Sequence, residues 1–365
     1  MADSIFISAG DPSGDNALSR VIEELNTAHP NLTCFGLGGK RLHKLGQEQF
    51  ADQEDLAVIG FWEVAKKYLF FRKLLNQCLK EIKSRKPTVV ILVDYPGFNL
   101  RLAKKIKELG IPIIYYISPQ IWAWGKKRIV EIKKNIDLMI PILPFEEKFY
   151  KDSGINVKYA GHYLTEDIKP DYIASVIPEN GHLALLPGSR KQEIERMLPV
   201  MLQTAEAVYA EYKIKSVIAG VENLFEYETL IQNKDFVSVI YDDSRKVVHD
   251  SKLVVTSSGT ATLEIGLIGR PMVIIYKTGT LTYQIAKRVV TLKSIGLVNL
   301  VLGENILPEL IQNEATEKNI TAALAKFLTD ETYRNECVAK LHLLPALLGA
   351  KDVSKNIAGF IGEYL

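Results

Sequence analysis

Polar side chains and glycines directly follow several strand-like runs of this 365-residue chain. The first such loop contains Gly10, Ser13 and Gly14, and glycines let a backbone approach a ligand closely, just before the free N–H groups of a helix N-terminus. Asp11 and Asp15 add two carboxylates. The loop is not GxGxxG, which argues against a nicotinamide-dependent dehydrogenase. It predicts a site for an anionic or hydroxyl-rich ligand, or else a tight turn in which Ser13 or Asp15 caps the helix.

Two further candidates follow the next strand-like runs. Asp94 comes directly after the apolar run Val89–Val93, so it is expected at the carboxyl edge of a sheet. A partly desolvated carboxylate there could act as a general base, or could cap the helix expected near Phe98. Trp122 and Trp124 follow the next run and could form an aromatic wall for a sugar ring or an acyl chain. The alternative for these tryptophans is a loop that closes the core.

Two loops in the second half combine a glycine with hydroxyl groups. Their backbone N–H groups, hydroxyls and one planar guanidinium suit phosphate oxygens. Glu264, one helical turn after the second loop, could accept ribose hydroxyls. The pattern favours a nucleoside diphosphate over a single capped helix, although neither loop has the GxxxxGK[ST] spacing of a Walker A motif. The loop residues are Gly188, Ser189 and Arg190, and then Ser258, Gly259 and Thr260.

Composition limits the class of protein. Lys and Arg number 45 against 43 Asp and Glu, and a net charge of +2 does not support a general nucleic-acid binder. Three scattered cysteines and six scattered histidines, without HxH or HExxH, predict no disulfide framework, no metal site and no cofactor held by one. No signal peptide is apparent, and no stretch approaches the roughly 20 apolar residues of a membrane span, so a cytoplasmic protein is expected.

One predicted helix, beginning near Glu63, carries more apolar side chains than its core stripe requires. The extra aromatic and aliphatic residues alternate with lysines, as in a helix that lies on an anionic bilayer surface. The alternative is a helix buried on two sides or at a dimer interface. The residues predicted to contact the membrane are Trp62, Lys66, Leu69, Phe70 and Lys73.

Short β-rich runs alternate with longer segments of helical period, which predicts an α/β fold with parallel sheets covered on both faces. Strands are expected at Ser4–Ser8, Cys34–Leu37, Val89–Val93, Ile113–Ile117 and Asp137–Ile140. The pattern restarts with strands at Leu183–Leu186, Ser216–Ala219, Val237–Ile240, Leu253–Thr256 and Met272–Tyr276. From about Glu314 onward the chain has no strand-like run and predicts two or three helices.

Four blocks, in their order and spacing, make the chain resemble the lipid-A-disaccharide synthase family of inverting glycosyltransferases. The blocks are Asp94–Asn99, Ser118–Trp124, Leu186–Arg190 and Pro308–Gln312. The resemblance implies two Rossmann-like doubly wound domains that face each other across a cleft (the GT-B architecture), with C-terminal helices. It also implies transfer of 2,3-diacylglucosamine from UDP-2,3-diacylglucosamine to 2,3-diacylglucosamine 1-phosphate, giving the β-1,6-linked lipid A disaccharide 1-phosphate and UDP.

Roles follow from the positions that match. Asp94 would be the base for the acceptor 6-hydroxyl, with Asp11 as a secondary acid or acceptor ligand. Arg190 and the two hydroxyl-bearing loops would hold the diphosphate, and Asn299 would lie near the nucleotide. The residues expected to bind the acceptor are Gly10, Ser13, Gly14, Asp15, Asn99, Gln120, Trp122 and Trp124.

The resemblance and a polar, proline-containing junction at Thr165–Gly181 together divide the chain. We predict an N-terminal acceptor and membrane domain over residues 1–164 and a UDP-sugar-binding domain over residues 165–345. A C-terminal helix over residues 346–365 would pack back on the first domain or be swapped with a partner, so monomer and homodimer both stay open. The family works on the cytoplasmic face of the inner membrane of Gram-negative bacteria, which implies peripheral attachment.

Two other interpretations keep the fold and change the function. The first is a UDP-N-acetylglucosamine 2-epimerase or a transferase acting on lipid-linked muramyl-pentapeptide, and the blocks around Asp94, Trp122 and Trp124 argue against both. The second is a nucleotide-sugar-binding or membrane-scaffold protein without turnover. Its signature would be the loss of Asp94 or Arg190, and both residues are present.

Overall fold

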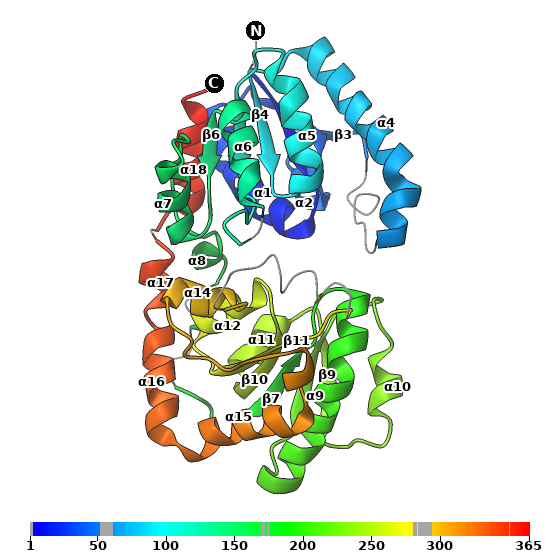
Figure 1. Cartoon of the computed structure of the whole chain (residues 1–365), viewed down its shortest axis with the longest axis vertical. Helices are drawn as coiled ribbons and strands as arrows, with labels where there is room; N and C mark the ends of the chain where they lie inside the picture. Colours follow the sequence, from blue (N-terminus) through cyan, green and yellow to red (C-terminus); the bar gives the residue numbers. More distant parts are fainter. Residues whose placement is uncertain are drawn as a thin grey trace. The chain divides into compact units, whose positions relative to one another are not determined.

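Two compact α/β units make up the chain in the computed structural model (Figure 1). The first unit comprises Met1–Tyr163 and Leu348–Leu365, and the second comprises Leu164–Leu347. The structure describes residues 3–51, 61–123, 125–168, 172–173, 176–279, 283, 294–349 and 351–365, and only the backbone of 61–68 and 126.

The first unit contains a parallel sheet in the order β3-β2-β1-β4-β5-β6. All five residues of Val89–Val93 are buried, as expected for a β-branched strand covered on both faces. The strand order reverses between β1 and β4, which is where ligands bind in doubly wound sheets. The strands are β1 (Ser4–Ala9), β2 (Thr33–Leu37), β3 (Glu48–Gln49), β4 (Val89–Val93), β5 (Ile113–Tyr116) and β6 (Leu138–Ile140).

Helices cover both faces of this sheet (Figure 1). On one face, Leu74 and Cys78 of α4 and Leu102 of α5 pack against Phe6 and Leu92 in one buried cluster. The C-terminal helix α18 packs against α1, which brings the end of the chain back to the first unit. The helices are α1 (Pro12–Ala28), α2 (Lys40–Lys44), α4 (Phe61–Arg85), α5 (Pro96–Lys107), the 3-10 turn η1 (Lys126–Arg128), α6 (Ile129–Asn135), α7 (Pro144–Asp152) and α18 (Val353–Gly362).

The second unit repeats the plan with a parallel sheet in the order β12-β11-β10-β7-β8-β9. Its order reverses between β7 and β10. The strands are β7 (His182–Leu186), β8 (Ser216–Gly220), β9 (Val237–Tyr241), β10 (Ser251–Ser257), β11 (Met272–Tyr276) and β12 (Glu309–Ile311). The helices are α8 (Leu164–Asp167), α9 (Lys191–Tyr212), α10 (Tyr227–Ile231), α11 (Ser244–His249), α12 (Ala261–Ile268), α14 (Leu297–Leu302), the 3-10 turn η3 (Gln312–Glu314), α15 (Glu317–Thr329), α16 (Glu331–Leu341) and α17 (Leu344–Leu347).

The predicted α/β class is confirmed, with two parallel six-stranded sheets. Two strands were not predicted, β3 and β12, because each is a short edge strand that contains Glu or Gln and shows no apolar run. The tail after Glu314 contains four helices in its described part, rather than two or three. No helix among the residues that the structure describes is long and apolar enough to cross a membrane.

Candidate active site

The loops after β1 and β4 meet at the carboxyl edge of the first sheet. Ala9 lies opposite Val93 in the register of these neighbouring strands, so the residues that follow are side by side. Gly10 lies against Tyr95, because a Cβ on Gly10 would be only 2.7 Å from the tyrosine ring. Asp94 and Tyr95 both have left-handed backbones, with φ of +45° and +48°. Asp94 therefore lies on a sharp turn at the carboxyl edge of the sheet, at the point where the strand order reverses.

Buried side chains hold this turn in place. Asn99 is fully buried, and its amide nitrogen donates to the carbonyl oxygens of Val93 (3.1 Å) and Asp94 (2.8 Å), while its oxygen accepts from the Ser8 hydroxyl (2.7 Å). The Tyr115 hydroxyl donates to the same Asp94 carbonyl at 2.5 Å. Burial raises the pKa of Tyr115 well above its usual value, so it stays a neutral donor. Asn99, predicted to bind the acceptor, thus fixes the backbone on which Asp94 stands.

The two aspartates of the first loop act as helix caps. Asp11, not Ser13 or Asp15, is the N-cap of α1, since Pro12 occupies the first helical position. The Asp11 carboxylate accepts from Gly14 N (3.0 Å) and from the Ser13 hydroxyl (2.6 Å). Asp15 is buried and accepts instead from backbone N–H groups at the start of α2, those of Gly39 (2.8 Å), Arg41 (3.1 Å) and Leu42 (3.3 Å).

Trp122 is largely buried, and its indole Nε1 donates to Glu146 Oε1 at 2.7 Å. The ring also meets Phe145 edge to face, with centroids 4.8 Å apart. Glu146 is 1% exposed, accepts from Leu143 N (3.0 Å), and has its pKa raised to about 7 by burial. The sequence prediction missed Glu146, although its place three residues after the N-cap of α7 is a capping-box position.

Of the other residues predicted to bind the acceptor in this segment, Gln120 is exposed and Trp124 lies outside the described residues.

The two predicted phosphate loops of the second unit lie at the ends of neighbouring strands. Leu186 of β7 pairs with Thr256 of β10, on either side of the point where the strand order reverses. Gly188 has φ of +120°, and a Cβ there would lie 2.6 Å from Glu193 Oε2, so this turn requires glycine. Arg190 is the N-cap of α9, with a side chain that is 66% exposed and bonded to Glu193 at 3.3 Å. Ser189 and Arg190 both face solvent.

The β10 loop is tied to its surroundings by side-chain bonds. The Ser258 hydroxyl donates to Ile295 O at 2.8 Å, and Thr260 is the N-cap of α12. Glu264 accepts from Arg245 Nε at 2.6 Å, and the same guanidinium bonds the buried Asp167. The Glu264 carboxylate, predicted to accept ribose hydroxyls, therefore already has a cation beside it.

Asn299 is buried, and both of its amide hydrogens are engaged. They go to Leu307 O (2.9 Å) and to Glu309 Oε1 (2.7 Å), while its oxygen accepts from Leu307 N (3.2 Å). Glu309 also accepts from the backbone N–H groups of Ile295 (2.7 Å) and Gly296 (3.1 Å) and from the Ser294 hydroxyl. The pair organises the loop before α14, and sequence reasoning had singled out only Asn299.

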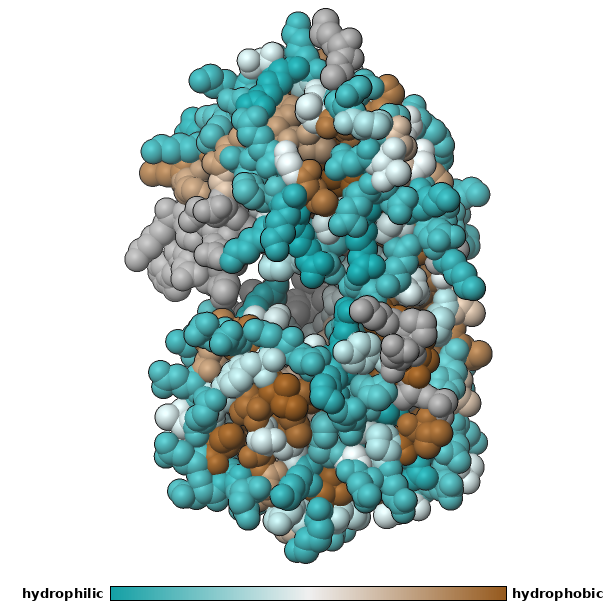
Figure 2. Space-filling view, turned by 180° about the vertical axis from the view of Figure 1, so that it is seen from behind, coloured by the Kyte–Doolittle hydropathy of each residue, from teal (hydrophilic) through white to brown (hydrophobic). Residues whose placement is uncertain are grey.

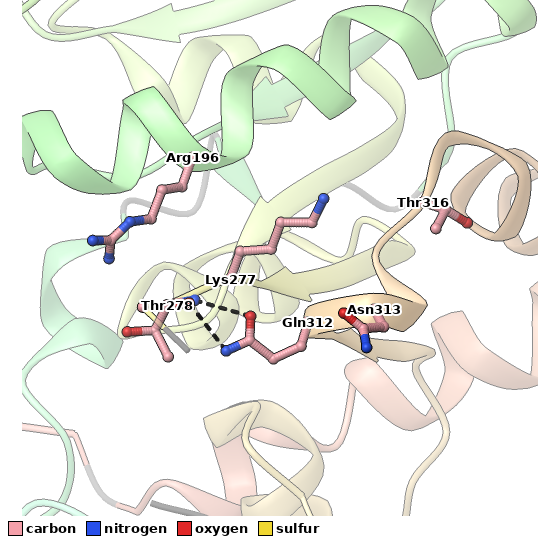
Figure 3. Close-up of a pocket in the computed structure, with 7 residues that line it drawn as sticks. Arg196, Lys277, Thr278, Gln312, Asn313 and Thr316 are labelled. Atoms are coloured by element: carbon pink, nitrogen blue, oxygen red, sulfur yellow. Dashed lines mark hydrogen bonds between the residues drawn. The ribbon is translucent and has the colours of Figure 1, made fainter. Parts of the chain in front are cut away.

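A hollow of about 520 Å³ lies beyond the ends of β11 and β12 (Figure 3). Gln312, with φ of +54°, joins the two strand ends, since its Oε1 accepts from Thr278 N and its Nε2 donates to Thr278 O, both at 3.2 Å. Two cationic side chains and no carboxylate line the hollow, which the sequence prediction did not identify. The lining residues are Arg196, Lys277, Thr278, Gly279, Gln312, Asn313 and Thr316.

The predicted membrane residues lie on α4. Leu69 is 65% exposed and Lys73 is exposed, whereas Phe70 is half-buried against Phe71. The side chains of Trp62 and Lys66 are outside the described part of the structure. Figure 2 shows hydrophobic side chains at the edge of the first unit where α4 lies, beside hydrophilic ones.

Known proteins resemble the chain along its whole length. A model of the family described as lipid-A-disaccharide synthetase matches residues 5–355. Proteins named lipid-A-disaccharide synthase from Anaeromyxobacter dehalogenans (strain 2CP-C) and Coxiella burnetii (strain CbuG_Q212) are both 36% identical to it. The two alignments each cover 98% of this chain and 96% and 97% of the relatives.

Solved structures share the fold at low identity. A kitacinnamycin glycotransferase has a TM-score of 0.65 at 15% identity, over 100% of this chain and 99% of its own. The UDP-GlcNAc 2-epimerase from Neisseria meningitidis bound to UDP-GlcNAc has a TM-score of 0.59 at 12% identity, over 99% and 98% of the two chains.

Proposed function

We infer the details of the reaction from one premise, that the chain belongs to the lipid-A-disaccharide synthetase family. This membership confirms the family predicted from the four sequence blocks. The protein is accordingly a glycosyltransferase that forms the lipid A disaccharide. We propose that its donor is UDP-2,3-diacylglucosamine, its acceptor 2,3-diacylglucosamine 1-phosphate, and its products the β-1,6-linked disaccharide 1-phosphate and UDP.

We propose that the edge of the second sheet binds the donor. The support is that Gly188–Arg190 and Ser258–Thr260 end neighbouring strands where the strand order reverses. The exposed Ser189 and Arg190 supply a hydroxyl and a planar guanidinium for the diphosphate. Asn299 keeps the nearby loop in shape through Glu309, and Glu264, beside Arg245, is left to accept ribose hydroxyls.

We propose that Asp94 is the general base. Its carboxylate removes the proton of the acceptor 6-hydroxyl as that oxygen bonds to the anomeric carbon of the donor sugar. The bond from this carbon to the phosphate oxygen breaks, and UDP leaves with the electron pair, so the anomeric configuration inverts. Arg190 and the loop N–H groups stabilise the departing charge. The observation that supports Asp94 most strongly is its turn at the switch point, held by Asn99 and Tyr115.

The test of the reaction is UDP release from UDP-2,3-diacylglucosamine with and without the acceptor, in detergent micelles that contain EDTA. Acceptor-dependent release together with a disaccharide mass supports the proposal. An epimerised sugar nucleotide would support a 2-epimerase, and UDP binding without turnover would support a non-catalytic protein.

Two matched variants separate the two aspartates. We expect Asp94→Asn to lower kcat/KM by about 100-fold or more, the usual contribution of a general base. Asp11→Asn is the comparison, because Asp11 caps α1: a much smaller loss than at Asp94 supports a capping role, and an equal loss supports the role as secondary acid or acceptor ligand. A variant at Asp94 that keeps more than about a tenth of kcat/KM, a loss under ~1.4 kcal/mol, rejects the assignment.

We propose that α4 attaches the protein peripherally to an anionic membrane surface. The support is the exposed Leu69 beside Lys73, together with the aromatic residues of the segment. Leu69→Glu should reduce cosedimentation with anionic vesicles, because its side chain does not belong to the core. Phe70→Ser is less suitable, since Phe70 packs against the buried cluster. Unchanged cosedimentation of the Leu69 variant would reject the proposed contact.

A further inference from the structure

The hollow at the ends of β11 and β12 concentrates positive charge. Arg196 comes from α9 and Lys277 follows β11, and neither makes an ion pair with a carboxylate within the described ranges. In Figure 3, Arg196 hangs from α9 on one side, Gln312 and Asn313 lie on the other, and Lys277 extends between them. Because both side chains line the hollow and no carboxylate among the described residues does, the hollow attracts an anion.

The other residues that line the hollow also present groups that favour an anion. Thr316 is the N-cap of α15, a 13-residue helix whose N-terminus therefore borders the hollow. The amide of Asn313 and the hydroxyl of Thr278 also line the hollow and can donate to oxygen atoms. The bidentate bond between Gln312 and Thr278 fixes the backbone next to Lys277, so this part of the lining is in place before a ligand arrives.

The opposite end of the same sheet edge has the reverse character. A hollow of about 890 Å³ beyond β8 and β9 is lined by four glutamates and only one cation, Lys191. An anionic ligand at this edge is therefore repelled from the β8 and β9 end and attracted to the β11 and β12 end. The glutamates are Glu195, Glu222, Glu226 and Glu228.

We propose that the hollow lined by Arg196 and Lys277 is a phosphate-binding subsite of this enzyme. This inference rests on the proposed substrates, which bring phosphate from two sources, the diphosphate of the donor and the 1-phosphate of the acceptor. The donor source is within reach, because β11 neighbours β10 and Ile275 pairs with Ser257 directly before the Ser258–Thr260 loop. The site recognises the phosphate group itself, whichever substrate carries it.

The test compares Arg196→Met, Lys277→Met and the double variant with Lys318→Met. Lys318 is an exposed lysine on the first turn of α15 that does not line the hollow, so it controls for net charge. Calorimetry measures binding of UDP and of 2,3-diacylglucosamine 1-phosphate in micelles, and initial rates give KM for each substrate. Loss of one charge-assisted bond should weaken binding about tenfold in each single variant and more in the double one.

Every outcome decides the proposal. Weaker UDP binding with unchanged acceptor KM assigns the subsite to the donor diphosphate, and the reverse assigns it to the acceptor phosphate. If neither Kd nor KM differs from the Lys318 control, the subsite does not exist. Failure of the proposed reaction is distinguishable, because UDP binding is measured without turnover. If the wild type makes no disaccharide, weaker UDP binding by Lys277→Met than by the wild type still supports the subsite.

Discussion

The buried carboxylate of Glu146 should make the stability of the first unit depend on pH. Burial raises its pKa from the usual 4.5 to about 7, despite the bonds from Trp122 and Leu143. Below pH 4.5 the group is protonated in both the folded and the unfolded chain. Between about pH 4.5 and 7 only the unfolded chain releases the proton, so the free energy of unfolding falls as pH rises and then levels off. The difference between the two pKa values corresponds to about 3 kcal/mol.

Replacing this carboxyl by an amide isolates the effect. Glu146→Gln cannot ionise, so the unfolding free energy of the wild type minus that of the variant should fall by about 2–3 kcal/mol from pH 5 to pH 8. The variant also loses one acceptor, which shifts the difference equally at every pH. Glu147→Gln, at the next residue of α7 and partly exposed, is the matched control for exchanging a carboxyl for an amide in this helix.

The assay uses the chain's three tryptophans, all of which lie in the first unit. Since Trp62, Trp122 and Trp124 precede residue 163, urea unfolding followed by tryptophan fluorescence reports on that unit alone. A difference between wild type and Glu146→Gln that stays flat from pH 5 to pH 8 would refute the reasoning. It would mean that the carboxyl group is solvated or that it shares its proton with another group.

Two further variants test the turns that carry the site. Gly188→Ala should destabilise the second unit by roughly 1–3 kcal/mol and weaken UDP binding, because φ is +120° and the new Cβ meets Glu193. The control is Gly259→Ala, since Gly259 has open space around it, and calorimetry should show that variant to be nearly as stable as wild type. Asn99→Leu should cost the first unit about 2 kcal/mol or more, since the carbonyls of Val93 and Asp94 lose buried donors. A loss below about 0.5 kcal/mol in the fluorescence assay would contradict the role given to Asn99.

The central strands and the loops that follow them could be predicted from sequence. Val89–Val93 is a run of β-branched and aliphatic residues, and its composition alone indicates a strand buried on both faces. Parallel strands place their carboxyl ends at one edge, so the residues after β1 and β4, or after β7 and β10, are brought to the same edge whatever their types. The local pattern and this general rule were sufficient to place Asp94, Arg190 and Ser258 at the carboxyl edges of the two sheets.

The partners of buried polar groups could not be predicted in the same way. Asp15 caps a helix that begins 25 residues later, and Glu146 meets Trp122 across 24 positions. Such pairs depend on how helices pack on the sheet, and the hydrophobic periodicity of a single segment does not predict contacts between distant segments. Glu309 of the edge strand β12 is a further example, because its side chain accepts hydrogen bonds from Ile295 N and from Asn299 and does not pack in the core.

Sequence blocks do not separate the side chains that touch a ligand from those that hold the site. Asn99 lies in one of the four blocks and Asn299 at another position that matches the family, yet each is buried with its amide hydrogens bonded to backbone or carboxylate oxygens. An amide in that state stabilises one loop geometry and has little left to offer a substrate. Arg190 is exposed after β7 and Lys277 is partly exposed after β11, so a phosphate in solvent can reach both side chains. Burial and hydrogen bonding therefore favour a positioning role for the two amides, and solvent access supports the binding role that we propose for the two cations.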